Sequence, residues 1–140
     1  MTTSVSYRFG EGLKARLAER AAAERISETT LVSRLLDEGL KISAHPGLVY
    51  RSGPAGRRAA LAGGPDVWEV IGALRHADGV GDEKIVDAAE QLGLPERLVR
   101  LAVSFAAAYP EEVEAIIAAN DVAAERARRL AEQRERLLAS

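Results

Sequence analysis

The start of the chain alternates polar and apolar side chains, and no other segment of the first 47 residues has this pattern. From Ser4 to Phe9 every second residue is apolar, which is the period of a β-strand with one buried face. A lone strand leaves its backbone N–H and C=O groups without partners, and even a two-stranded ribbon needs helices packed on it. The simplest partner is the same strand of a second copy, antiparallel across a two-fold axis. The sequence therefore predicts an intertwined homodimer.

Two helices are expected after this strand. Leucines and alanines recur at helical spacing from about Glu11 to Glu24, and Arg25-Ile26 makes a turn. Ser27 is a suitable N-cap for the second helix, whose apolar stripe contains Leu31, Leu35 and Leu36. Pro46-Gly47 ends this helix if it extends that far.

This arrangement, from about Ser4 to Leu40, resembles the ribbon-helix-helix repressors of the Arc, MetJ and CopG type. The likeness rests on the alternating strand, the leucine-bearing first helix and the start of the second helix at Ser27-Glu28-Thr29-Thr30-Leu31-Val32. The chain departs from that family at Gly10, where Pro or a polar cap is common, and at Glu24-Arg25, where Gly is usual. The competing interpretation is a small helical domain in which the strand has no role.

The resemblance implies a protein that binds double-stranded operator DNA in the major groove. Base contacts would come from the outward-facing strand residues, with Arg8 the strongest candidate because Arg can hold guanine O6 and N7 together. Phosphate contacts would come from the start of the second helix. The base-contact candidates are Ser4, Ser6 and Arg8, and the phosphate-contact candidates there are Ser27, Thr29 and Thr30.

The charge distribution favours the first half of the chain as the part that meets phosphate. The formal net charge is −2, but residues 1–64 hold 10 Lys and Arg against 6 Asp and Glu, whereas residues 65–140 hold 9 against 15. These balances of +4 and −6 sum to the total. Unpaired cations in the first half could displace counterions from DNA.

A short β-hairpin is predicted after residue 47. Leu48 to Arg51 and Arg57 to Leu61 form its strands around a turn rich in Gly and Pro, and residues 48–64 contain three Arg and no acid. Either Arg57 and Arg58 contact the DNA backbone, or the segment is a solvated link between two lobes; the sequence leaves both possibilities open.

The rest of the chain is predicted to be a helical lobe with a helix-turn-helix-like pair over residues 82–109. Ala89, Gly93 and Val99 have the spacing of that motif. Its acidic surroundings would repel phosphate, so we favour a structural or protein-binding role over DNA contact. Trp68 is expected to be a core anchor.

Residues from His45 to about Ile117 resemble a domain of predicted antitoxins whose partners are PIN-like nucleases. The residues behind this likeness are His45-Pro46-Gly47-Leu48-Val49-Tyr50, Gly56-Arg57-Arg58, Asp66-Val67-Trp68-Glu69-Val70 and Tyr109-Pro110-Glu111-Glu112. It implies an antitoxin that represses its own operon, with a PIN-like toxin as a possible partner.

The C-terminal segment is predicted to be a partner-binding helix. Ala123, Ala127, Leu130 and Leu137 recur at spacings of three, four or seven, and Asn120-Asp121 could interrupt the helix or begin a second one. Its partner-binding candidates are Arg128, Leu130, Arg134 and Leu137. The alternative to a partner-binding helix is a solvent-exposed helix stabilised by ion pairs between its own side chains.

Several classes of protein are disfavoured. The chain has no Cys and two His, so we expect no zinc site, no other metal and no cofactor. Adjacent acidic pairs such as Asp82/Glu83 diverge on a helix, so we expect no enzyme. No apolar run of bilayer-spanning length is present, and we expect a cytoplasmic protein without a membrane partner.

The predicted fold class is mostly α, with an N-terminal β-α-α dimer unit, a hairpin and a helical lobe with a long C-terminal helix. The expected domains are residues 1–44 for DNA binding and dimerisation, 45–120 for an antitoxin-like lobe and 121–140 for partner binding. The predicted function is a DNA-binding transcriptional regulator and type II antitoxin; the alternative is a free-standing transcription factor without a toxin.

Overall fold

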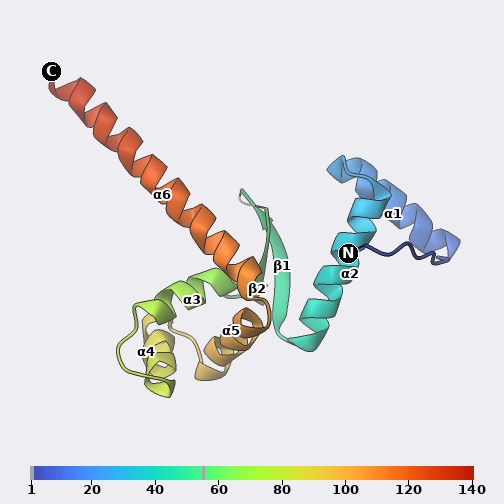
Figure 1. Cartoon of the computed structure of the whole chain (residues 1–140), viewed down its shortest axis with the longest axis horizontal. Helices are drawn as coiled ribbons and strands as arrows, with labels where there is room; N and C mark the ends of the chain where they lie inside the picture. Colours follow the sequence, from blue (N-terminus) through green and yellow to red (C-terminus); the bar gives the residue numbers. More distant parts are fainter. Residues whose placement is uncertain (1, 55) are drawn as a thin grey trace. The chain divides into compact units, whose positions relative to one another are not determined.

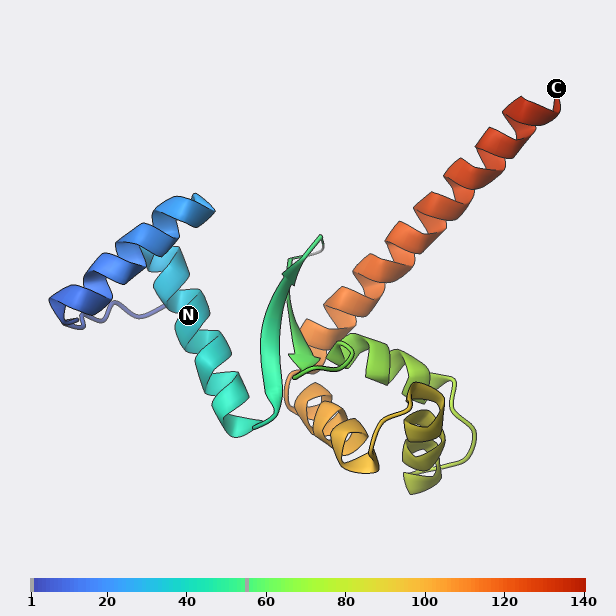
Figure 2. The same cartoon turned by 180° about the vertical axis from the view of Figure 1, so that it is seen from behind.

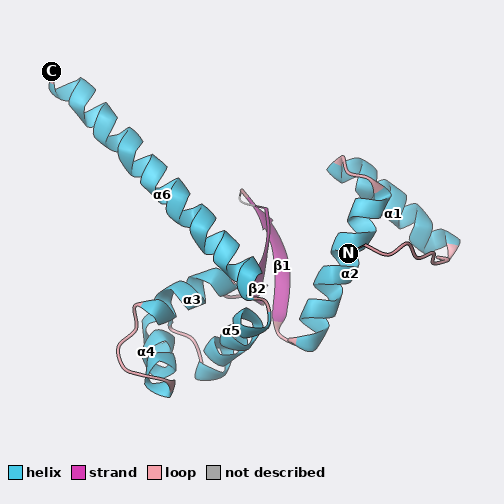
Figure 3. Cartoon of the chain, viewed as in Figure 1, coloured by secondary structure: helices cyan, strands magenta, loops and turns pink. Residues whose placement is uncertain are grey.

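The computed structural model describes residues 2–54 and 56–140 and is mostly helical (Figures 1 and 3). The chain divides into two compact units, Met1–Ala44 and His45–Ser140. We call them the N-terminal unit and the C-terminal unit. Among the described residues, no helix combines the length and the apolar character that crossing a bilayer requires.

The N-terminal unit is a pair of helices, α1 (Glu11–Glu24) and α2 (Glu28–Ala44). α1 has the bounds expected from its periodicity, and α2 begins directly after Ser27, as expected. Leu17 and Ala21 of α1 pack with Leu31 of α2, which is fully buried. Arg25 makes the turn in the left-handed region at φ 57°, and the N–H of Ile26 bonds back to Ala21 O at 3.0 Å.

The predicted N-terminal β-α-α fold is wrong. Residues 2–10 have no regular secondary structure, and the two strands of the chain follow α2 instead of preceding α1. The physical reason is that the backbone of a strand needs a hydrogen-bonding partner. None of the described residues of the chain pairs with this segment. Alternation of side chains alone does not make a strand.

The C-terminal unit begins with a two-stranded antiparallel sheet, β1 (Leu48–Gly53) and β2 (Gly56–Leu61). Leu48 lies opposite Leu61, and Gly53 lies opposite Gly56 next to the turn. The hairpin predicted from the sequence is present. Residues 59–61 are buried, because one end of β2 packs against α3.

Three helices, α3 (Val67–Arg75), α4 (Asp82–Leu92) and α5 (Glu96–Ala108), pack against one another after the hairpin. Phe105, Val70 and Val99 are fully buried among them. Gly93 ends α4 at φ 65°, where the N–H of Leu94 bonds to Ala89 O at 3.0 Å. The predicted helix-turn-helix-like pair is therefore α4 and α5.

The last helix, α6 (Pro110–Ala139), is one continuous element. Its first turns pack on α3 and α5, and it then extends well beyond them (Figures 1 and 2). Asn120 does not interrupt it, because its side-chain Nδ2 donates to Ile116 O at 2.9 Å within the helix. All residues from 121 onward are exposed.

Candidate functional site

The residues predicted to read DNA bases are exposed. Ser4, Ser6 and Arg8 all lie in the irregular segment before α1. The apolar residues between them are also exposed, with Val5 at 61% and Tyr7 at 71% of their full surface. Because the segment is not a strand, nothing in its backbone assigns these two sets to opposite faces. Their contact with bases stays a prediction.

Ser27 caps α2 as expected. Its Oγ accepts the backbone N–H of Thr30 at 3.0 Å and donates to Thr30 Oγ1 at 2.8 Å. This cap occupies one of the amide groups that a phosphate would use. Thr29 is exposed beside it. Ser27 has a clear structural role, and phosphate contact by Ser27, Thr29 and Thr30 stays a prediction.

Ion pairs fasten α1 to α2. Arg34 donates to both oxygens of Glu24 at 2.9 and 3.0 Å and lies 3.9 Å from Glu38. The hydrogen bonds that Arg34 donates to Glu24 raise the pKa of its guanidinium above its ordinary value. Lys14 pairs with Glu28 at 2.6 Å. These ion pairs join the two helices, and each of these cations is partly compensated by its acidic partner.

Three other cations of the N-terminal unit remain exposed. Arg8, Arg16 and Arg25 have no acidic partner among residues 2–54 and 56–140. The same unit exposes a set of large apolar side chains, which we call the exposed apolar set. Its members are Val5, Tyr7, Phe9, Leu13, Leu35, Leu36 and Leu40. Four of them, Val5, Tyr7, Phe9 and Leu36, line one open groove between the N-terminal segment and the two helices.

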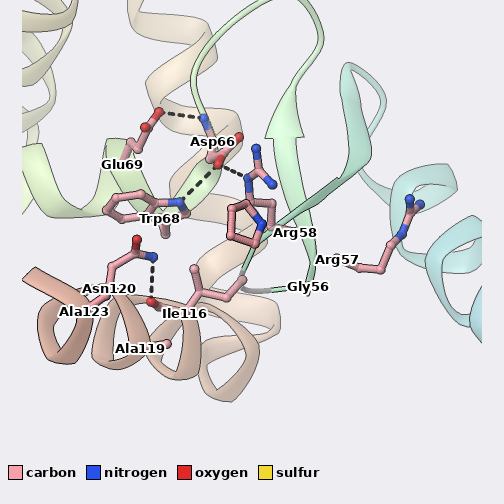
Figure 4. A pocket seen from close by; sticks show the side chains of 11 residues that line it. Gly56, Arg57, Arg58, Asp66, Trp68, Glu69, Ile116, Ala119, Asn120 and Ala123 are labelled. Carbon is pink, nitrogen blue, oxygen red and sulfur yellow. Dashed lines mark hydrogen bonds and ion pairs between the residues drawn. The ribbon is translucent and has the colours of Figure 1, made fainter.

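In the C-terminal unit, Asp66 is the centre of a polar cluster at the start of α3 (Figure 4). Its side chain is 9% exposed, and its Oδ2 accepts Arg58 Nε and, at 3.1 Å, Trp68 Nε1. Arg51 lies 3.7 Å from Oδ1 and donates to Leu61 O and Gly64 O, both at 2.9 Å. Arg51 and Arg58 thus tie the hairpin to the first turn of α3.

This cluster bears on the predicted phosphate contacts of the hairpin. Much of the Arg58 charge is compensated by the Asp66 carboxylate, which leaves less of it for DNA. Arg57 donates to Ser52 Oγ, its neighbour on the opposite strand of the hairpin, at 3.0 Å. The structure therefore gives Arg58 a structural role, while DNA contact by either residue stays a prediction.

In the helix-turn-helix-like pair, one cation of α5 lies close to two acids. Arg100 of α5 lies 3.3 Å from Asp82 and 3.9 Å from Glu96. A helix with this surface would bring carboxylates close to phosphate, which is unfavourable. The geometry agrees with a structural role for α4 and α5.

The four predicted partner-binding residues all lie on the exposed half of α6. Leu130 is 60% exposed and Leu137 is 77% exposed. Arg128 pairs with Glu125 on the same helix, and Arg134 has no acidic partner within the described ranges. The structure places these residues along one helix, and their contact with a partner stays a prediction.

Sequence reasoning missed the most ordered interactions of the C-terminal unit. Phe105 packs edge-on against His45 and Tyr50, with ring centroids 5.4 and 6.5 Å away, and Tyr50 donates to Glu112 at 2.7 Å. No periodic pattern links these residues, because the hairpin and α6 bring them together from distant parts of the chain. Within the described residues, no group of three or more His, Asp or Glu side chains could hold a metal ion.

Comparison with known proteins gave no match to any family model, curated protein or solved structure. The resemblance to repressors and antitoxins therefore rests on the quoted residues alone.

Proposed function

We propose that this chain is a DNA-binding transcriptional regulator that acts as a homodimer through its N-terminal unit. The observation that carries the proposal is the composition of that unit's surface. Three exposed cations, Arg8, Arg16 and Arg25, have no acidic partner in the described part of the chain and accompany the exposed apolar set. Cations suit a polyanion, and exposed apolar side chains in this number suit a protein interface.

The size of the N-terminal unit supports the dimer. Its core of buried apolar residues consists of Leu17, Ala21 and Leu31, with Ile26 and Val32 packed against them. A unit of about 40 residues seldom folds alone without disulfides, metals or association, and this chain has no Cys. A second copy would cover the exposed apolar set with an identical set, as isologous interfaces do.

The test is a gel shift of the full chain on DNA from its own promoter region, with Arg8→Ala as the variant. If Arg8 reads a base pair, the variant should lose about 1–3 kcal/mol of specific binding, roughly 5- to 150-fold in Kd. Arg129→Ala, which removes an exposed Arg from α6, is the matched control and should bind like wild type. Equal affinity and sequence preference for wild type and Arg8→Ala would remove Arg8 from the DNA interface.

The more specific form of this proposal is an antitoxin that also neutralises a PIN-like nuclease. Its support is the resemblance of residues His45 to Ile117 together with the exposed second half of α6, which offers a surface to another protein. The test is co-expression with the product of a neighbouring short reading frame. Recovery of a nuclease by the full chain but not by a chain ending at Asn120 is expected. Equal recovery by both would contradict a role for α6, and absence of such a gene favours the free-standing regulator.

A further inference from the structure

Asp66 can release Arg58 without being left unpaired. Its carboxylate also accepts Trp68 Nε1 at 3.1 Å and the backbone N–H of Glu69, and it lies 3.7 Å from Arg51. Breaking a buried ion pair is costly because it leaves one charge uncompensated. Asp66 keeps its other partners when Arg58 leaves, and the Arg58 side chain is 25% exposed, so water can solvate its guanidinium.

The guanidinium of Arg58 fits beside Asp66 because residue 53 is a glycine. A Cβ added at Gly53 would lie 2.8 Å from Arg58 Cζ and closer still to its Nη1, and real Cβ atoms essentially never lie within 3.0 Å of another heavy atom. The backbone of Gly53 lies outside the left-handed region, so its conformation does not itself require glycine. Gly53 and Asp66 thus form a place for the guanidinium, which we call the Arg58 slot (Figure 4 shows Arg58 bonded to Asp66).

The hairpin that carries Arg58 is basic. Residues 48–64 contain Arg51, Arg57 and Arg58 and no acid. Arg51 is fixed by two hydrogen bonds to backbone carbonyls, whereas Asp66 is the one acidic partner of Arg58 among the described residues. One carboxylate does not neutralise two guanidinium groups, so this surface stays positive. A positive surface attracts polyanions, and DNA is the polyanion of the proposed function.

We propose that the Arg58 slot is an autoinhibitory contact, in which Asp66 and Gly53 withhold Arg58 from the phosphate backbone of DNA. A phosphate offers a guanidinium the same pair of oxygen acceptors as a carboxylate, so the two compete for Arg58. Withholding one cation lowers the sequence-independent part of the affinity, so that base contacts such as that proposed for Arg8 make up a larger share of the whole. The slot has this role only if the chain binds DNA as proposed above.

Gly53→Ala tests the slot without removing a charge. The added methyl group displaces the guanidinium, which is the far end of a flexible side chain and can move. Binding of the full chain to a mixed-sequence duplex unrelated to its promoter is measured over a range of salt concentrations. The variant should bind severalfold more tightly than wild type at low salt. Its slope of log Kobs against log salt concentration should steepen by about 0.9 for one added phosphate contact.

Two further variants are the controls. Gly72→Ala is the matched control, because a Cβ at Gly72 would meet nothing within 4 Å, and it should bind like wild type. The double variant Gly53→Ala/Arg58→Gln lacks the released guanidinium, so it should lose the gain. A gain that persists in the double variant would overturn the proposal, because it would come from a group other than Arg58.

Asp66→Asn releases Arg58 by a second route, which covers the case in which Gly53→Ala distorts the hairpin. Asn still caps α3 and can accept the Trp68 N–H, but it lacks the charge that holds Arg58. The same gain in affinity and slope is expected. It should be lost in Asp66→Asn/Arg58→Gln, which has the net charge of wild type.

The outcomes separate the slot from the proposed function. If Gly53→Ala and Asp66→Asn both bind the unrelated duplex like wild type, the bond between Arg58 and Asp66 is a structural tie only, whether or not wild type recognises its promoter. If wild type shows no preference for its promoter while release of Arg58 tightens binding to the unrelated duplex, the proposed regulator falls and the slot stands. If no variant binds any duplex at low salt, both fall.

Discussion

Replacing Asp66 by Ala should lower the free energy of unfolding of the C-terminal unit more than removal of any other single charge described above. Asp66 is the shared acceptor for Arg58 and Trp68 and lies 3.7 Å from Arg51. Removing one partner of a buried ion pair costs about 3–5 kcal/mol. The Arg58 and Arg51 side chains are 25% and 36% exposed, so water can partly replace the carboxylate and the lower end applies.

Loss of the helix cap adds to this cost. Asp66 precedes α3 as its N-cap, and its side chain accepts the backbone N–H of Glu69 in a capping box, a bond that Ala cannot make. An Asp N-cap contributes about 1 kcal/mol. We therefore expect Asp66→Ala to lower the free energy of unfolding by about 3–4 kcal/mol in total.

Urea unfolding followed by tryptophan fluorescence measures this directly, because Trp68 is the only Trp and donates to Asp66. The matched control is Asp82→Ala, which removes an exposed pair with Arg100 whose Asp side chain is 79% exposed. That change should cost less than about 1 kcal/mol. If Asp66→Ala shifts the free energy no more than Asp82→Ala does, Asp66 does not fasten the hairpin to α3.

Three further changes test the backbone and the core, each by urea unfolding against wild type. Arg25→Gly should stabilise the N-terminal unit by up to about 1 kcal/mol, because Arg25 holds φ 57°, a conformation that favours Gly; a loss of stability would contradict this. Gly93→Ala should destabilise the C-terminal unit by about 1 kcal/mol, since Gly93 ends α4 at φ 65°; an unchanged midpoint would count against it. Phe105→Ala should cost about 3–5 kcal/mol, because Phe105 is fully buried; a cost below about 1 kcal/mol would show that the site collapses without loss.

Local patterns predicted the helices and the hairpin well. The periodicity of Leu13, Leu17 and Ala21 indicated α1, and Ser27 marked the start of α2, which its Oγ caps in the structure. Such features depend on neighbours within a few residues, so the sequence alone contains them. Asn120 was ambiguous for the same reason: its side chain could end a helix or bond back within it, and it bonds to Ile116 O.

Features that depend on distant partners could not be predicted in the same way. The side chains from Ser4 to Phe9 alternate as those of a strand do. A strand also needs a hydrogen-bonding neighbour, and the single chain offers none among its described residues. Arg58 was assigned to DNA because the hairpin has no acid of its own. The acid that it contacts in the structure, Asp66, lies eight residues further on and reaches it only when the hairpin folds against α3.

Selection of DNA from a random duplex library, with the full chain at physiological salt, tests the central proposal most directly. We expect enrichment of a site with two-fold symmetry, bound by two chains with a Kd on the order of 10⁻⁸ M or tighter. The complex should weaken steeply as salt rises, as phosphate contacts require. A library that shows no enriched sequence, or a chain that binds all duplexes equally, would contradict the assignment of this protein as a DNA-binding regulator.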